Sequence, residues 1–174
     1  MPTPDRTSLD DIVQAGRDLI ETGGAAKLTM QAVAERVGVR PPSLYKRVRD
    51  RDALLVLVAQ ATVDDLARRL AASDQSLAGV ARTYRAFARE RPEGFRLMFS
   101  VDGAADALER VSAPVLLIAR DLAGADAALE AARLITAWAT GFIDMELAGA
   151  FRLGGDIDRA FEFGLERLER GLRG

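Results

Sequence analysis

The sequence contains no cysteine and no histidine, and both absences narrow the chemistry that it can perform. Without cysteine there are no disulfides, no thiolate metal sites and no cysteine nucleophiles. Without histidine the chain lacks the commonest general base, the serine–histidine–aspartate triad and the ligands of most transition-metal sites. Catalysis would have to depend on carboxylates, lysine or tyrosine, and we expect neither an enzyme nor a bound metal or cofactor.

Long apolar runs are also missing from the sequence. No segment approaches the roughly 18 uninterrupted apolar residues of a membrane span. The start of the chain, MPTPDRTSLDD, carries acids where a signal peptide needs cations followed by an apolar run. We therefore expect a cytoplasmic protein that does not bind membranes, and its 49% hydrophobic content over 174 residues is ample for a packed core.

Strand-like alternation with a period of two is absent over any useful length, whereas helical spacing recurs throughout the chain. The pattern predicts an all-α fold of about nine helices, with N-caps expected at Ser8, Thr29 and Asp50. The expected helices span residues 9–20, 29–37, 42–48, 52–70, 77–88, 92–99, 108–122, 127–151 and 157–172.

The most informative segment is 29–51, TMQAVAERVGVRPPSLYKRVRDR, which predicts two short helices joined by a turn at residues 37–39. Gly38 can take the positive φ of such a turn, and Pro41 and Pro42 suit the first turn of the second helix. In a chain of net charge -2, the stretch from residue 36 to residue 51 carries one acid, Asp50, against a local excess of cations: Arg36, Arg40, Lys46, Arg47, Arg49 and Arg51. A helix-turn-helix with such a patch indicates a nucleic-acid partner.

The second helix of a helix-turn-helix lies in the major groove, where side chains reach base edges. Arg40 or Lys46 can donate to guanine O6 and N7, and proline or tyrosine rings can contact thymine methyl groups. Tyr45 has an alternative interpretation as a core aromatic, and Arg47 and Arg49 taken singly fit solvated charges at least as well. The candidates around the recognition helix are Arg40, Pro41, Pro42, Ser43, Tyr45 and Lys46.

Three segments resemble the TetR/AcrR family of transcriptional regulators: LTMQAVA at 28–34 running into the turn, SLYKRV at 43–48, and RDALL at 51–55. The second is similar to the family's SLYxHF, with Arg47 and Val48 replacing histidine and phenylalanine, and the third to its KEALL. The resemblance implies that Thr29, the Tyr45 hydroxyl and Arg51 contact phosphates, and that Gln31 can reach bases.

Residues 138–151 resemble the WHG-type regulatory domain of a subset of the family, with Thr140 at the histidine position. The resemblance implies a helix-turn-helix DNA-binding domain at residues 1–51 and a helical ligand-binding and dimerisation domain at 52–174. The expected effector contacts, for which plain core is the alternative, are Tyr84, Phe87, Phe95, Met98 and Phe99. The expected dimer contacts, with core as an equal alternative for Trp138 and Phe142, are Leu134, Trp138, Gly141, Phe142, Met145, Phe161 and Leu168.

The family resemblance implies a ligand-responsive regulator, most often a repressor, that binds an inverted-repeat operator in double-stranded DNA as a homodimer and is released by a small apolar effector. The alternatives are a helical ligand-binding or interaction module without operator binding, and a small helical enzyme or carrier. Asp144 and Glu146 diverge on their helix, which disfavours paired-carboxylate catalysis. Glu146 is expected to face solvent or an interface, and the alternative is a buried acid paired with a cationic ligand or with an arginine such as Arg152. Arg85 is expected to lie on a polar face.

Overall fold

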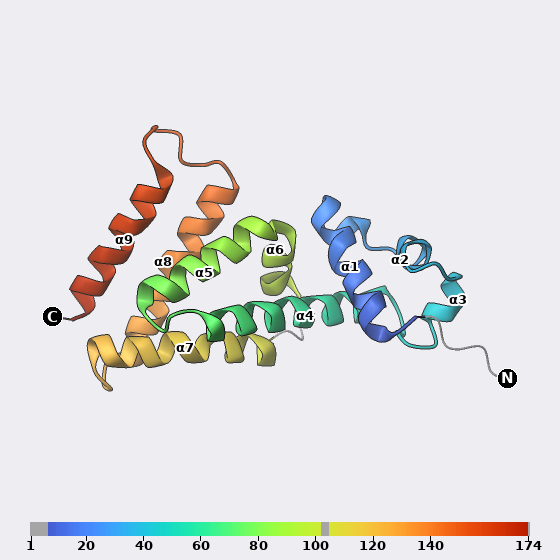
Figure 1. Cartoon of the computed structure of the whole chain (residues 1–174), viewed down its shortest axis with the longest axis horizontal. Coiled ribbons are helices and arrows are strands. Elements are labelled where there is room, and N and C mark those ends of the chain that lie inside the picture. The colour runs from blue at the N-terminus through green and yellow to red at the C-terminus, as the bar shows by residue number, and fades with distance from the viewer. Residues whose placement is uncertain (1–6, 102–104, 174) are drawn as a thin grey trace. The chain divides into compact units, whose positions relative to one another are not determined.

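The computed structural model describes residues 7–101 and 105–173 of the chain. These residues form nine α-helices and one short 3-10 helix, without a strand, which confirms the all-α prediction (Figure 1). In chain order the elements are α1 Leu9–Gly23, η1 Ala25–Lys27, α2 Met30–Arg36, α3 Pro41–Leu44, α4 Arg51–Ala72, α5 Leu77–Glu90, α6 Pro92–Ser100, α7 Ala105–Ala123, α8 Ala128–Leu147 and α9 Ile157–Leu172.

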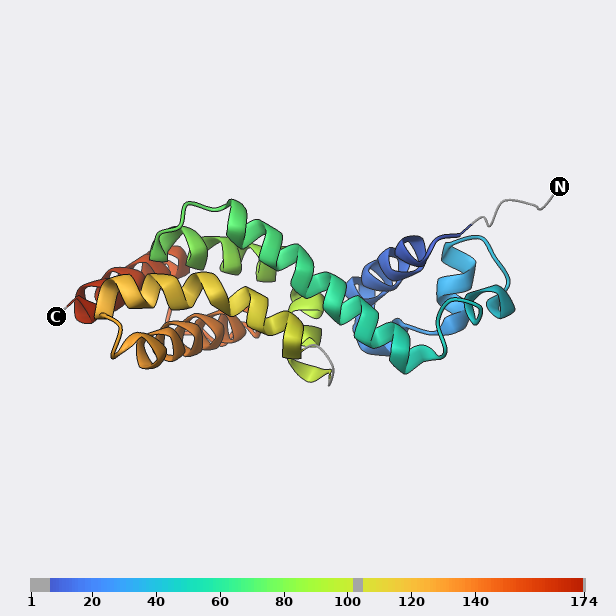
Figure 2. The same cartoon turned by 90° about the horizontal axis from the view of Figure 1, so that it is seen from below.

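The contacts divide the chain into two compact units. The first unit is Met1–Asp65 with Arg91–Leu108, and the second unit is Leu66–Glu90 with Glu109–Gly174. The helix α4 is continuous and contributes residues to both units (Figure 2). The expected domain boundary between residues 51 and 52 refers to function and stays a prediction. By contacts, the first part of α4 and all of α6 belong with α1, α2 and α3.

The helix α1 begins with a reciprocal cap. The Ser8 hydroxyl accepts the Asp11 N–H at 3.0 Å, and the Asp11 carboxylate accepts the Ser8 N–H at 2.9 Å, which satisfies amides that the helix leaves free. The face that carries Ile12 is buried in the core of the first unit. At Gly16 an added Cβ would lie 2.8 Å from Val58 Cγ2, so the glycine permits close approach of α1 and α4.

The turn between α2 and α3 has the expected geometry. Thr29 caps α2 by accepting the Ala32 N–H at 3.0 Å, which confirms the predicted N-cap. Gly38 has a φ of +73°, a conformation that side-chain-bearing residues rarely adopt. Pro41 is the first residue of α3, where its missing N–H costs no helical hydrogen bond.

The recognition segment contains less helix than predicted. The helix α3 ends at Leu44, and the next three residues form a turn in which the Arg47 and Val48 amides both donate to the Leu44 carbonyl at 2.9 Å. Both Leu44 and Val48 are buried in the core of the first unit. The apolar spacing over residues 42–48 therefore reflects two anchors on either side of a turn, and not a continuous helix.

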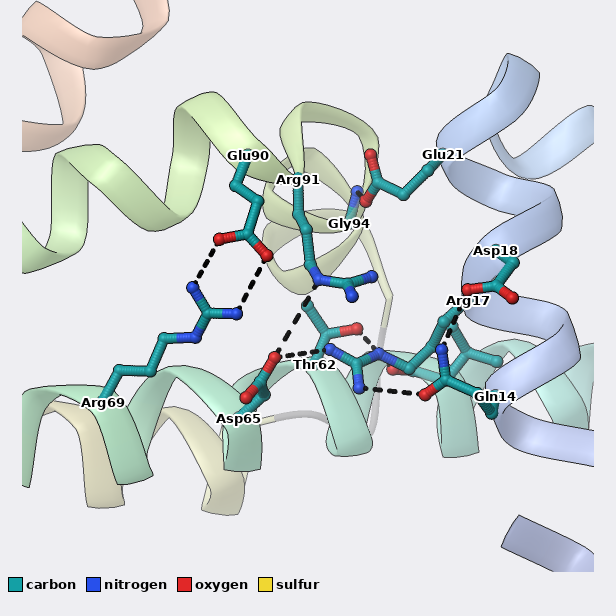
Figure 3. Close-up of polar contacts among 11 residues, drawn as sticks. Gln14, Arg17, Asp18, Glu21, Thr62, Asp65, Arg69, Glu90, Arg91 and Gly94 are labelled. Atoms are coloured by element: carbon teal, nitrogen blue, oxygen red, sulfur yellow. Dashed lines mark hydrogen bonds and ion pairs between the residues drawn. The ribbon is translucent and has the colours of Figure 1, made fainter. Parts of the chain in front are cut away.

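Arg17 ties α1 to α4 through an ion pair (Figure 3). Its Nη2 atom donates to the Asp65 carboxylate at 2.8 Å, and the two side chains are only 11% and 15% exposed. Arg91, the residue before α6, approaches the same carboxylate at 4.0 Å. Removing the Asp65 carboxylate would leave two guanidinium groups of the first unit without this partner, which makes the pair costly to break.

Glu21 ties α1 to the start of α6 (Figure 3). Its carboxylate accepts the Gly94 N–H at 2.8 Å and the Glu93 N–H at 3.3 Å. These amides lie in the first turn of α6, which has no side-chain cap of its own, so a carboxylate from another helix satisfies them and complements the helix dipole. An added Cβ at Gly94 would lie 2.7 Å from the Glu21 carboxylate, so a glycine suits this contact.

Arg85 connects α5, α8 and α9 in the second unit. Its Nε and Nη2 atoms donate to the Glu146 carboxylate, both at 2.7 Å, and Nη2 lies 2.7 Å from the Asp158 carboxylate. The guanidinium also lies 4.6 Å from the centroid of the Phe161 ring. Hydrogen bonding to Glu146 raises the pKa of Arg85. Because Arg85 is only 7% exposed, its expected place on a polar face is wrong, and the partner of Glu146 is Arg85 and not Arg152.

Three aromatic rings pack together beside this arginine. Trp138 stacks on Phe161 with centroids 5.2 Å apart, and Phe142 meets Phe161 edge-on at 5.2 Å. Trp138 also covers Gly164 on α9, where an added Cβ would lie only 2.2 Å from the indole Cζ2. The indole ring therefore requires glycine at this position of α9.

We expect Gly164→Ala to lower the free energy of unfolding by about 1–3 kcal/mol, because Trp138 or α9 must shift to admit the methyl group. The matched control is Gly171→Ala in the same helix, where an added Cβ meets no atom within 4 Å, and which should be nearly neutral. Urea denaturation of both variants measures the difference. Equal stabilities would show that α9 does not confine the indole.

Candidate nucleic-acid interface

The surface of the helix-turn-helix presents the residues that were predicted to lie around the recognition helix. Leu44 and Val48 are 0% and 2% exposed, whereas the Tyr45 side chain between them is 53% exposed. The alternative of a core tyrosine is therefore wrong. Pro41 is half-buried, and the remaining candidates are exposed: Arg40, Pro42, Ser43 and Lys46.

Two exposed candidates at the start of α2 already have hydrogen bonds within the protein. The Thr29 hydroxyl serves as the cap of α2, and the Gln31 side-chain amide donates to the Glu35 carboxylate at 2.5 Å. A hydroxyl that accepts one bond can still donate another, so the cap leaves Thr29 able to donate to a phosphate. Gln31 would have to exchange its contact with Glu35 for a base, and both roles stay predictions.

Arg51 supports the entry into α2. Its Nε and Nη2 atoms donate to the carbonyls of Leu28 and Ala25, each at 2.7 Å. These carbonyls lie at η1 and just before α2, and the Ala25 carbonyl also accepts the Leu28 N–H at 3.2 Å. The guanidinium thus gives each carbonyl a charged donor and links α4 to the entry of α2. The side chain is nevertheless 41% exposed. Arg51 therefore has a structural role, and its contact with a phosphate stays a prediction.

The cations of this region differ in whether they are already neutralised. Arg36 and Arg49 each pair with an aspartate, at 3.1 and 2.6 Å. Arg40 and Lys46 have no ion-pair partner among the residues that the structure describes. An unpaired cation needs no existing ion pair to be broken before it meets a phosphate or a guanine, so Arg40 and Lys46 are the strongest candidates of the site.

Lys27 is a further unpaired cation that the sequence reasoning missed. It is exposed in η1, just before α2, and none of the described residues pairs with it. The signal was present in the sequence, since Lys27 precedes the predicted cap Thr29 by two positions. The basic patch defined from Arg36 onward does not include it.

The residues predicted to contact an effector are divided between the two units. Phe95, Met98 and Phe99 lie on α6 in the first unit, and Tyr84 and Phe87 lie on α5 in the second. Of the five, Phe99 is 53% exposed, whereas Phe87, Phe95 and Met98 are buried. Their role toward an effector stays a prediction.

The residues predicted to form a dimer interface differ in exposure. Leu134 and Met145 on α8 are 50% and 47% exposed, and Gly141 between them is also exposed. On α9, Phe163 is 57% exposed, an apolar side chain that the prediction did not include. These residues give α8 and α9 an apolar surface within the second unit.

The remaining dimer candidates contribute to the second unit itself. Phe161 is fully buried, and Trp138 and Phe142 pack against it. Leu168 on α9 is half-buried. The ring contacts favour the core alternative for Trp138 and Phe142, and a role in dimerisation stays a prediction.

The described residues contain no group of three or more Asp, Glu, His or Cys side chains arranged to hold a metal ion. In the same part of the chain, no helix has the length and apolar character needed to cross a bilayer.

Two family models match the chain. Residues 12–58 match that of the bacterial regulatory proteins of the tetR family, and residues 77–168 match the tetracyclin repressor-like C-terminal domain. The class A tetracycline repressor of Escherichia coli transposon 1721 is 27% identical over 157 residues, which are 86% of this chain and 73% of that repressor. The class D repressor of Escherichia coli is 31% identical over 101 residues, 57% of this chain and 44% of its own length.

Solved structures share the fold. A TetR variant from Acinetobacter baumannii AYE, in complex with minocycline, has a TM-score of 0.68 at 22% identity and covers 95% of this chain and 96% of its own. Mycobacterium smegmatis BioQ has a TM-score of 0.62 at 23% identity, with 96% and 98% covered. The chain therefore belongs to the TetR family of bacterial regulatory proteins, whose members are non-enzymatic, ligand-responsive DNA-binding repressors.

Proposed function

We propose that the protein is a homodimeric transcriptional repressor that binds an inverted-repeat operator and is released by a small, mainly apolar ligand. The observation that carries the proposal is the exposed recognition segment with two unpaired cations, Arg40 and Lys46. Nucleic acid is the partner that such a surface fits, because its phosphates supply the negative charge and its base edges supply acceptors for lysine and arginine.

The exposed residues divide into two kinds of DNA contact. Lys46 and Arg40 can donate to guanine O6 and N7, and the exposed Pro42 and Tyr45 rings suit thymine methyl groups. Hydroxyls and cations outside the groove hold phosphates, which set orientation and not sequence. Thr29 at the cap of α2 and Lys27 just before it fit that second role.

A dimer follows from how such proteins read an operator. Two recognition helices must enter successive major grooves about 34 Å apart, which a two-fold pair of protomers achieves on an inverted repeat. The exposed apolar side chains on α8 and α9, Leu134, Met145 and Phe163, supply a surface that would be buried between two copies.

Ligand release requires that the effector bind the DNA-incompetent state more tightly. A coupling of about 1–3 kcal/mol would weaken operator binding roughly 5- to 150-fold, and operator would weaken ligand binding by the same factor. The Acinetobacter relative was solved with minocycline, which supports a ligand for this chain too. The continuous helix α4 holds Arg51 in its first turn and reaches into the second unit, so its displacement would connect ligand to DNA.

We expect Lys46→Ala to weaken operator binding. If Lys46 contacts a phosphate, the slope of log affinity against log salt concentration should fall in magnitude by about 0.9, the loss of one ionic contact. If Lys46 reads guanine, the variant should show a relaxed base preference. Because Lys46 is exposed and has no partner among the described residues, the substitution should change the free energy of unfolding of the protein by less than about 0.5 kcal/mol. Selection from a random DNA pool followed by salt-dependent anisotropy measures affinity, slope and preference.

The control for Lys46→Ala is Arg120→Ala on α7, an exposed arginine outside the helix-turn-helix. It should leave the salt slope and the selected sequence unchanged. If the wild-type protein retains no DNA sequence selectively at low salt, the alternative of a helical module without operator binding takes the place of the repressor.

Arg51→Ala should differ from Lys46→Ala by lowering stability as well as DNA affinity. Two carbonyls, of Leu28 and Ala25, lose a charged donor, which should reduce the free energy of unfolding by about 1–2 kcal/mol after allowance for partial exposure. Urea denaturation and anisotropy on the same samples separate the effects. A variant with full stability would contradict the structural role, and an unchanged salt slope would remove Arg51 from the phosphate contacts.

Gly141→Trp should separate the protomers without unfolding them. An added Cβ at Gly141 meets no atom within 4 Å, so the protomer can accept a larger side chain there, whereas a close helix pair between copies cannot. Sedimentation velocity at micromolar concentration should show a monomer with native circular dichroism. A folded Gly141→Trp variant that remains dimeric would place the interface elsewhere.

A further inference from the structure

A groove between α7 and α8 lies within the second unit and has a volume of about 710 Å³. It falls in the size range of small-molecule sites, and most of its lining is alanine, valine and leucine. Figure 1 shows α7 and α8 as consecutive helices that both lead away from the turn joining them. Its leucines are poorly covered by the protein, since Leu116 is 43% and Leu129 is 50% exposed.

The charged groups of the groove lie toward opposite ends. The two helices are consecutive and joined by a short turn, so Leu116 on α7 lies toward the same end as Leu129 on α8, and Glu109 lies toward the end with Thr140. The α8 lining from residue 129 to 140 extends roughly 16 Å at about 1.5 Å per residue. Arg133 lies one turn from Leu129, near the leucines and away from Glu109.

Arg133 is available to a ligand. None of the described residues forms a hydrogen bond or ion pair with its guanidinium. A guanidinium beside an apolar groove is a good partner for a carboxylate, which it can bind through two parallel hydrogen bonds. At the other end, Glu109 would repel a second anion, so a ligand with a single carboxylate has one favourable orientation.

Thr140 supplies a polar side chain at the end of the groove away from the α7–α8 turn. Its hydroxyl is 3.1 Å from the hydroxyl of Tyr84, and burial raises the pKa of Tyr84 to about 12, so the tyrosine stays neutral at ordinary pH. The leucines and Arg133 therefore lie toward the turn that joins α7 and α8, and Thr140 and Glu109 lie toward the other end of the groove.

We propose that this groove binds a small amphipathic acid, with its carboxylate on Arg133 and its apolar body along Leu116 and Leu129. This inference rests on the proposed ligand-responsive function and names the chemical class and the place of its effector. The exposed leucines supply the affinity for the apolar body, and Arg133 selects the sign of the charge.

The test is calorimetric titration of the free protein with decanoate, decanol and decyltrimethylammonium below their micelle concentrations. Decanoate should bind most tightly of the three. Arg133→Gln should weaken decanoate about tenfold and leave decanol unchanged. Ala113→Trp, at an exposed alanine of the groove, should weaken both because the indole fills the space. Arg120→Gln, an exposed arginine on α7 that does not line the groove, is the matched control and should change neither.

Several outcomes would overturn the proposal: no decanoate binding, tighter binding of the cationic amphiphile, or decanoate binding that neither Arg133→Gln nor Ala113→Trp alters while both remain folded. A loss confined to Phe99→Ala would place the ligand at the α6 aromatic residues. The titration contains no DNA, so a protein that fails to bind decanoate can still bind operator as proposed. A protein that fails to bind operator can still be tested for decanoate binding, so failures of the two proposals are distinguishable.

Discussion

The position of the helix-turn-helix depends on how charged side chains hold α1. One face of α1 is fixed by apolar packing, but an apolar face alone leaves a helix free to slide along its neighbours. The Arg17–Asp65 pair and the Glu21 cap of α6 remove that freedom, because both contacts require particular atoms at 2.8 Å. The Arg17 and Asp65 side chains are only 11% and 15% exposed, so misplacement of α1 would leave poorly solvated charges without a partner. Since α2 packs on α1, the exposed recognition segment inherits this precise placement.

Sequence patterns predicted the helices well where a helix has one apolar face and a recognisable cap. Residues 157–172 and the caps at Ser8, Thr29 and Asp50 agree with the structure. The recognition helix was overestimated because Leu44 and Val48 have helical spacing, which a turn with two anchors also satisfies. Local periodicity cannot distinguish these cases, since only the tertiary position of the core decides where the chain turns.

Side-chain partners were harder to predict than helices. Arg85 was expected on a polar face because arginine is seldom buried, yet it lies beneath α8 and α9 with its charge balanced by Glu146 and Asp158. These acids follow it by 61 and 73 positions in the sequence, so no local pattern indicates the pairing. Arg51 illustrates the same difficulty at the candidate DNA site, because its carbonyl partners are defined only once η1 forms. A family motif identifies such a residue without saying whether it acts on DNA or on the fold.

The contrast between an acidic chain and a basic recognition surface follows from which cations are paired. Salt screens charges over about 8–10 Å, so an approaching DNA duplex responds to the local surface and not to the net charge of -2. Within the first unit, Arg17, Arg36 and Arg49 each have an aspartate within 4 Å. Those pairs stabilise or order the protein but contribute little external field. Arg40 and Lys46 remain uncompensated among the described residues, so on the proposed function the attraction to phosphate is strong at the segment that is proposed to contact bases. If the segment binds DNA as proposed, pairing of the other cations orients the protein on DNA as well as holding its helices together.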